Sequence, residues 1–286
     1  MLTTYQGNAN APPSITMSAI IYTLRLLIAT DIPMNQGVLA PITIHTPPGT
    51  VINPTADAAV STGNALTSQR LVDVILKAFE ASAGSQGCMG CTSMFGGPRE
   101  DGGFDYAYGE TICGGNGAGP TWHGSEIPTQ VHMTNTRATD VEVLEKRYPL
   151  ILREFSVRRG SGGKGLHRGG NGAKRVFEAR EPLYFSFMSE RRTIPPYGLS
   201  GGGPGERGLN LRVKKSMAGG FITVNLGPRS NFVLQPGEQF VINTPGGGGW
   251  GKEGTTSAVI SKSENKVTYG RAAGSVTAFK ELQDGQ

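Results

Sequence analysis

Apolar side chains recur at helical spacing in two stretches near the start of the chain. The first covers about residues 14–28, between a Pro-Pro pair and a turn-forming Asp-Ile-Pro sequence. The second covers about residues 69–82, where the apolar repeat follows the 3.6-residue period of a helix. Its predicted inner face consists of Leu71, Val72, Ile75, Phe79 and Ser82. Thr67 or Ser68 is expected to cap this helix, and Gly84 to follow its last turn.

Weaker patterns follow each of these helices. Residues 38–52 are predicted to form two short strands around a Pro-Gly turn. Residues 84–130 hold 13 glycines and little periodicity. Because this segment also contains five aromatic residues, we expect an ordered loop rather than a disordered linker. A short helix over about residues 140–147 comes next, with Thr139 and Glu142 at the spacing of a capping box.

Residues 150–251 alternate between strand-like runs and glycine-rich turns. The runs are ILREFSVRR, AKRVFEA, LYFSFMS, LNLRVKK, FITVNL, NFVLQ and QFVINT. Their spacing is typical of β-sandwiches and barrels. The sequence therefore predicts an α+β protein in which residues 1–149 are mixed α/β and residues 150–251 are β-rich. Residues 252–286 are polar and aperiodic, and we predict a disordered tail.

Composition and charge narrow the possible partners and the location. The 286 residues include 43 Gly and 18 Pro, below the share that predicts low-complexity disorder. The 27 basic and 22 acidic residues are interspersed without a block of one sign, which argues against a nucleic-acid binder. The start of the chain lacks the features of a secretory signal, and the most apolar run, residues 15–29, is too short to span a bilayer. A cytosolic protein with neither nucleic acid nor membrane as a partner is expected.

Three motifs that could hold a cofactor or a metal fail on their context. Residues 160–165 read G-x-G-x-x-G, but the following sequence cannot start the helix that a dinucleotide site needs. Residues 246–252 nearly spell a phosphate-binding loop, yet Glu253 replaces the hydroxyl residue that would bind magnesium. Cys88 and Cys91 form a single C-x-x-C, for which a structural role is favoured over zinc binding with Cys113 and a histidine. We expect this chain alone to bind no cofactor and no metal.

Polar residues concentrate in two segments that could carry chemistry. Residues 132–137, HMTNTR, offer hydrogen-bond donors and acceptors between the glycine-rich loop and the short helix. Residues 189–192, SERR, end a strand, and glycine-rich chain follows shortly after. Paired arginines beside a glycine backbone suit a carboxylate ligand. A structural Glu–Arg network at the strand end is the alternative.

At these segments the sequence resembles a known family. The segments are SQRLVDVILKAFEASAGSQG, GETICGGNGAGPTWHG, HMTNTRATDVEVLEKRYPLILREFSVRRGSGGKG, HRGGNGAKRVFE, SERRTIPPYGLSGGGPGERGLN and INTPGGGGWG. In this collinear order they resemble the hydantoinase B/oxoprolinase family, and within it the eukaryotic ATP-dependent 5-oxoprolinases. The resemblance implies that residues 1–251 are a hydantoinase B-like region. The sequence departs from the family's usual residues at positions 89–91, Met-Gly-Cys, and 122–124, Trp-His-Gly.

The resemblance also implies an activity and partners. Enzymes of this kind are hydrolases that use ATP to open the cyclic amide 5-oxo-L-proline to L-glutamate in glutathione metabolism. ATP, Mg and another divalent metal are implied for the complete enzyme, with an upstream hydantoinase A-like or N-terminal segment, or a second copy, as partner. The candidate catalytic residues are His132, Asn135 and Glu190, and the candidate substrate-binding residues are Thr134, Arg137, Arg191 and Arg192. A non-catalytic remnant of the same fold and a hydantoinase acting on a related cyclic amide are the alternatives.

Overall fold

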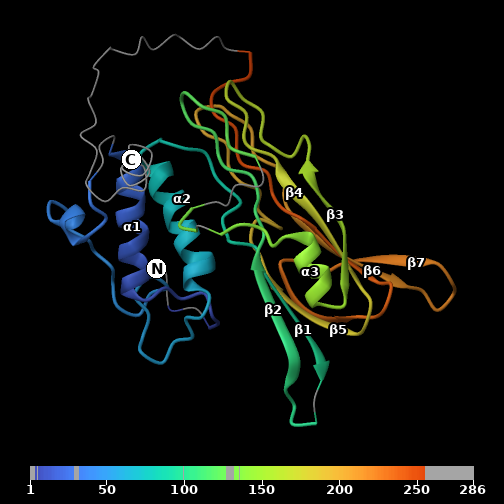
Figure 1. Cartoon of the computed structure of the whole chain (residues 1–286). Helices are drawn as coiled ribbons and strands as arrows, with labels where there is room; N and C mark the ends of the chain where they lie inside the picture. The colour runs from blue at the N-terminus through green and yellow to red at the C-terminus, as the bar shows by residue number, and fades with distance from the viewer. Residues whose placement is uncertain are drawn as a thin grey trace, which may run out of the picture.

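The computed structural model places a helical part beside two β-sheets (Figure 1). It describes residues 4, 6–28, 32–98, 100–126, 132–134 and 136–254. The predicted disordered tail therefore lies, from residue 255 on, outside the described residues. In the described part, no helix has the length and apolarity needed to cross a membrane.

The helices largely follow the predicted positions. They are α1 (Pro13–Leu27), η1 (Gln36–Leu39), η2 (Gly63–Thr67), α2 (Ser68–Ala78) and α3 (Val141–Arg147). The α1 and α2 helices pack together through Ala19, Val72 and Leu76. The prediction of two strands at residues 38–52 is wrong. This stretch contains three prolines, which cannot donate to a strand ladder, and it forms the end of η1 and an isolated Thr50–Asn53 bridge.

The ends and inner face of α2 differ from the prediction. No side chain caps its start, because η2 leads directly into it and Thr67 is itself helical. The helix ends at Ala78, before Gly84, and Glu80 adopts the left-handed conformation with φ +51° while the Ala81 amide bonds back to the Leu76 carbonyl. The buried residues are Ser68, Gln69, Val72, Asp73 and Leu76, whereas Phe79 is exposed. Polar residues thus occupy part of the buried face.

Two further local predictions need correction. The α3 helix is capped by the Asp140 carboxylate, which accepts hydrogen bonds from the amides of Glu142 and Val143, and not by Thr139. The Thr139 hydroxyl instead accepts a hydrogen bond from Tyr108. The predicted loop at residues 84–130 contains a hairpin of β1 (Cys91–Pro98) and β2 (Phe104–Thr111). Its alternating aromatic residues are a strand signal that the many glycines obscured.

All seven predicted strands of the C-terminal part are present. They are β3 (Leu150–Arg158), β4 (Gly172–Ala179), β5 (Leu183–Met188), β6 (Leu209–Lys215), β7 (Phe221–Asn225), β8 (Arg229–Leu234) and β9 (Gln239–Asn243). One sheet has the order β2-β1-β5-β8 and the other β3-β4-β9-β6-β7, with antiparallel pairing throughout. Both sheets contribute to one aromatic core, in which the ring centres of Phe185 of β5 and Phe240 of β9 are 5.5 Å apart. The α+β prediction is confirmed, and the β-rich part resembles a sandwich.

Extended glycine-rich segments run together between the helices and the sheets (Figure 1). We call them the glycine layer, which comprises residues 83–88, 112–118, 162–170, 196–205 and 245–251. Its segments bond to one another through their backbones, as from Ala118 N to Gly248 O at 2.9 Å and from Gly203 N to Lys164 O at 2.7 Å. A Cβ atom on Gly247 would lie 1.8 Å from the Asn116 carbonyl oxygen. Close backbone packing therefore accounts for much of the glycine content.

Candidate functional site

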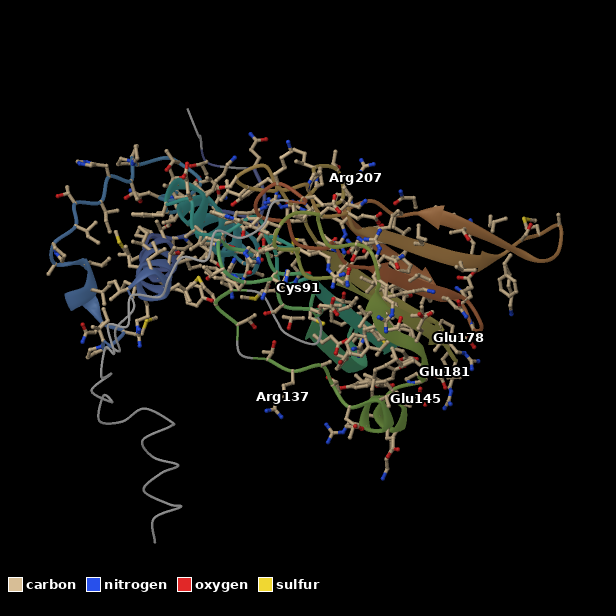
Figure 2. The ribbon with its side chains drawn as sticks, turned by 90° about the horizontal axis from the view of Figure 1, so that it is seen from above. Cys91, Arg137, Glu145, Glu178, Glu181 and Arg207 are labelled. Carbon is tan, nitrogen blue, oxygen red and sulfur yellow. The ribbon has the colours of Figure 1, made fainter. Side chains whose placement is uncertain are left out.

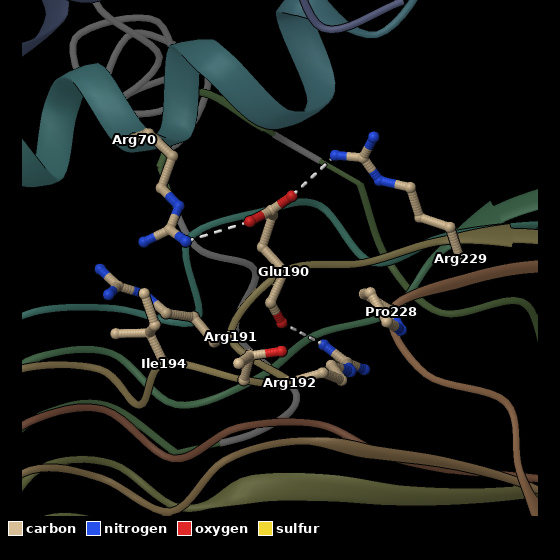
Figure 3. A pocket seen from close by; sticks show the side chains of 8 residues that line it. Arg70, Glu190, Arg191, Arg192, Ile194, Pro228 and Arg229 are labelled. Atoms are coloured by element: carbon tan, nitrogen blue, oxygen red, sulfur yellow. Dashed lines mark hydrogen bonds and ion pairs between the residues drawn. The ribbon is translucent and has the colours of Figure 1, made fainter. Parts of the chain in front are cut away.

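A cavity of about 360 Å³ opens where α2 passes the end of β5 (Figure 3). We call it the arginine cavity. It is lined by Arg70, Glu190, Arg191, Arg192, Thr193, Ile194, Pro228 and Arg229. Four guanidinium groups thus share the lining with a single carboxylate. The excess of positive charge suits an anionic ligand.

Glu190 is held at both its side chain and its main chain. Its carboxylate accepts hydrogen bonds from Arg70 Nη2 at 3.1 Å and from Arg229 Nη2 at 3.0 Å, one on each side (Figure 3). Its amide donates to Cys88 Sγ at 3.1 Å, and its carbonyl accepts from Arg192 Nη1 at 2.7 Å. The strand end is therefore fixed independently of the carboxylate.

Arg191 is bound to a buried carboxylate of α2, that of Asp73. Asp73 accepts hydrogen bonds from Arg191 Nη2 at 3.2 Å, His132 Nε2 at 3.2 Å and the Ser85 amide at 3.1 Å. Burial alone would raise the pKa of this carboxyl, but the hydrogen bond with His132 and the charges of His132 and Arg191 hold the pKa below its usual range. Asp73 is therefore an ionised group inside the protein.

Arg192 and Tyr197 complete the surroundings of this network. Arg192 Nη2 donates to Asn210 Oδ1 at 3.1 Å, and burial lowers the pKa of Arg192 to about 10, which leaves it charged at neutral pH. The Arg191 guanidinium lies 5.6 Å from the centre of the Tyr197 ring. The Tyr197 hydroxyl donates to the Asp73 carbonyl at 2.5 Å. Both sequence-adjacent arginines are thus engaged by protein groups.

A second cavity, of about 310 Å³, has mostly apolar walls and includes His132. Its apolar side chains come from Tyr22, Leu26, Leu27, Leu76, Ala81 and Trp122. The imidazole of His132 meets the Tyr22 ring edge-on, with 6.0 Å between ring centres. Since His132 lines this cavity and Arg191 lines the arginine cavity, Asp73 connects the two through direct hydrogen bonds.

The structure brings together four of the predicted site residues. His132 and Arg191 meet at Asp73, and Glu190, Arg191 and Arg192 line the arginine cavity. The Thr134 hydroxyl lies elsewhere, 3.1 Å from that of Thr136.

Arg137 and Asn135 are the two remaining predicted site residues. Arg137 is exposed, points outward in Figure 2 and lines neither cavity. Asn135 lies outside the described residues. None of these positions tests the predicted roles.

Sequence reasoning missed Arg70, Asp73 and Arg229. A signal for Asp73 existed, because it falls on the same helical stripe as Val72 and Leu76, where a carboxylate is unexpected unless it is paired. No comparable signal marks Arg70 or Arg229. They reach the site only because α2 and the start of β8 approach the end of β5.

The motifs discounted for nucleotide and zinc binding have other contacts. The amides of Gly163, Gly247 and Gly249 donate to carbonyls of the glycine layer, so they are not directed at a phosphate. Burial raises the pKa of Cys88, and raises the pKa of both Cys91 and Cys113 to about 11. Among the described residues, no three His, Cys, Asp or Glu side chains gather as they would around a metal ion. The absence of cofactor and metal binding by this chain stays a prediction.

Comparison with known proteins points to one family. Residues 3–253 match the Hydantoinase B/oxoprolinase family. The 5-oxoprolinase of Dictyostelium discoideum is 51% identical over 86% of this chain, a match that covers 19% of the relative. The 5-oxoprolinase of Saccharomyces cerevisiae is 49% identical over 86% of this chain and is covered to 20%. This chain therefore spans about a fifth of the length of these curated relatives.

A solved structure shares the fold. The ATP-dependent caprolactamase from Pseudomonas jessenii superposes with a TM-score of 0.72 at 20% sequence identity. The match covers 88% of this chain and 45% of the caprolactamase chain. With the family match over most of its length, this chain belongs to the hydantoinase B/oxoprolinase family.

Proposed function

We propose that this chain forms the distal segment of an ATP-dependent 5-oxoprolinase, a hydrolase that opens 5-oxo-L-proline to L-glutamate in cytosolic glutathione metabolism. The observation that carries the proposal is the 51% identity to a protein named 5-oxoprolinase over 86% of this chain. The fold shared with a caprolactamase, which by its name also opens a cyclic amide with ATP, supports the same class of reaction.

The chemistry assigns this segment a binding role. A lactam is a resonance-stabilised amide, and its ATP-driven opening requires groups that hold nucleotide and metal. The glycine motifs of this chain do not fit that task, since the amides of Gly163, Gly247 and Gly249 donate to carbonyls of the glycine layer. The relatives carry about four fifths of their length outside the match, and those regions are proposed to supply the ATP and metal sites. The arginine cavity is proposed to attract the anionic group of the substrate.

The alternative is a non-catalytic segment with a structural role. The ion pairs of Glu190 with Arg70 and Arg229 favour it, because protein groups alone already neutralise this carboxylate. The two functions differ in whether the segment supports turnover when the remaining regions are present.

A chimera distinguishes these functions. The matched segment of the Saccharomyces cerevisiae 5-oxoprolinase is replaced by residues 3–253 of this chain, and ADP and glutamate are measured with 5-oxo-L-proline present. Turnover within about tenfold of the parent enzyme is expected, because the exchanged segments are 49% identical. A tenfold loss corresponds to about 1.4 kcal/mol of activation free energy. A chimera that folds like the parent but releases no glutamate would contradict the proposed function. The isolated chain is expected to release neither product.

A further inference from the structure

We propose that the arginine cavity binds a compact oxyanion, a carboxylate or phosphate group, between Arg70 and Arg229 in the position now taken by the Glu190 carboxylate. The choice of 5-oxo-L-proline as the carboxylate ligand rests on the proposed function. Binding of an oxyanion by the cavity does not, because it follows from the arrangement of charges in this chain.

The first support is the charge of the cavity. Four arginines share the lining with one glutamate, and the ionised Asp73 behind the wall compensates Arg191, which leaves two positive charges in excess. Arg70 and Arg191 lie close enough to repel, and burial together with the charge of Arg70 lowers the pKa of Arg191. An anion bound against Arg70 would offset this repulsion in place of the Glu190 carboxylate.

The second support is that the four arginines of the cavity have different partners. Arg191 and Arg192, which the sequence singles out, are bound to Asp73, Asn210 and backbone carbonyls. By contrast, Arg70 and Arg229 meet at the Glu190 carboxylate, and their side chains are 32% and 39% exposed. The geometry assigns ligand contact to these two residues, and it assigns Arg191 and Arg192 to holding the cavity wall.

The third support is that Glu190 can leave without disturbing the fold. Its main chain is fixed by Cys88 and Arg192, so its side chain can rotate away while the strand end stays in place. Partly exposed arginine–carboxylate pairs contribute little to stability, so replacing one carboxylate by another is close to balanced. The cavity volume of about 360 Å³ is adequate for a small cyclic acid.

Isothermal titration of the full chain tests the proposal with three ligands. They are 5-oxo-L-proline, inorganic phosphate and 2-pyrrolidinone, which has the same lactam ring without the carboxylate. At least one of the two anions is expected to bind, whereas 2-pyrrolidinone is not. Arg70→Ala and Arg229→Ala should each weaken anion binding about tenfold or more, as expected for loss of a charge-assisted hydrogen bond. Glu190→Gln should strengthen binding severalfold because it removes the competing carboxylate.

The controls come from a matched ion pair on the sheet surface. Arg153 pairs with Glu178 at 2.7 Å outside the cavity, and Arg153→Ala and Glu178→Gln should leave anion binding unchanged. Tighter binding of 5-oxo-L-proline identifies a carboxylate site, and tighter binding of phosphate identifies a phosphate site.

Two results would overturn the proposal. One is that neither anion binds to the natural chain and neither binds to the Glu190→Gln variant. The other is an affinity in folded Arg70→Ala equal to that in Arg153→Ala. Failure here leaves the chimera assay as an independent test of the proposed function.

Discussion

Two arginine–carboxylate clusters in this protein have opposite surroundings. In the sandwich, Arg175 of β4 pairs with Glu110 of β2 at 2.8 Å, and the two side chains are only 1% and 5% exposed. The Arg175 guanidinium lies 4.8 Å from the centre of the Phe155 ring and 5.1 Å from that of Phe177. In the arginine cavity, Glu190 is 24% exposed and its partners more so.

The difference in burial predicts a difference in role. A charge in the sandwich core cannot lose its partner without a large desolvation cost, so the Glu110–Arg175 pair acts as a fixed link between the two sheets. In the arginine cavity, Glu190, Arg70 and Arg229 are within reach of solvent and of other anions. The same residue types thus serve as a structural connection in one region and as an exchangeable contact in the other.

The largest effect is expected in the sandwich. Glu110→Gln leaves the Arg175 charge unpaired in the core and should lower the free energy of unfolding by about 3–5 kcal/mol. Urea denaturation measures the change. The variant Glu178→Gln should cost less, because its partner Arg153 is half-exposed and stays solvated when the carboxylate is removed. Equal losses in the two variants would break the distinction based on burial.

A comparable effect is expected at Asp73. Its carboxylate, 2% exposed, is bound by the buried Arg191 and by His132, so Asp73→Asn should lower the free energy of unfolding by about 3–5 kcal/mol. The same denaturation experiment measures it. A change below about 0.5 kcal/mol, the usual range of surface substitutions, would show that the link between the two cavities contributes nothing to stability.

The stabilisation by Asp73 should depend on pH. Its pKa is lower in the folded protein than in the unfolded chain, so this stabilisation is fully present above the unfolded value of about 3.9. It is lost as the pH falls through the lower folded value. Unfolding free energies measured between about pH 6 and pH 2.5 should therefore show a difference between the natural chain and Asp73→Asn that shrinks below about pH 4. A difference that stays constant in acid would exclude the ionised carboxylate as its source.

The smallest effect on stability is expected at Glu190. Glu190→Gln should change the free energy of unfolding by about 1 kcal/mol or less, because its ion pairs are partly exposed. A loss of about 3 kcal/mol or more, the range of a broken buried pair, would place Glu190 with the structural pair of the sandwich instead.

The same contrast explains what the sequence could and could not predict. The seven strands of the C-terminal part follow from short-range alternation, and Glu190, Arg191 and Arg192 were found because they are adjacent in the chain. The β1–β2 hairpin was missed because glycines needed for strand pairing and close packing resemble those of loops. At Gly96, for example, a Cβ atom would lie 2.1 Å from the Tyr106 hydroxyl oxygen.

The rest of the candidate site depends on long-range packing. Arg70 lies 120 positions before Glu190, and the contact exists only because α2 is held against the glycine layer. Asp73 likewise meets Arg191 across 118 positions. Local periodicity carries no information about such pairs, although a carboxylate on the inner stripe of a helix indicates that a partner must exist.

The most direct test of the account measures how much a ligand stabilises the chain. A ligand that binds only the folded state at 100 times its dissociation constant raises the free energy of unfolding by about 2.7 kcal/mol. Urea midpoints are compared with and without whichever of 5-oxo-L-proline and inorganic phosphate binds more tightly, for the natural chain, Arg70→Ala and Arg153→Ala. The ligand should raise the midpoints of the natural chain and of Arg153→Ala equally, and that of Arg70→Ala by about half as much or less. An equal rise in all three proteins, or none in the natural chain, would contradict the account.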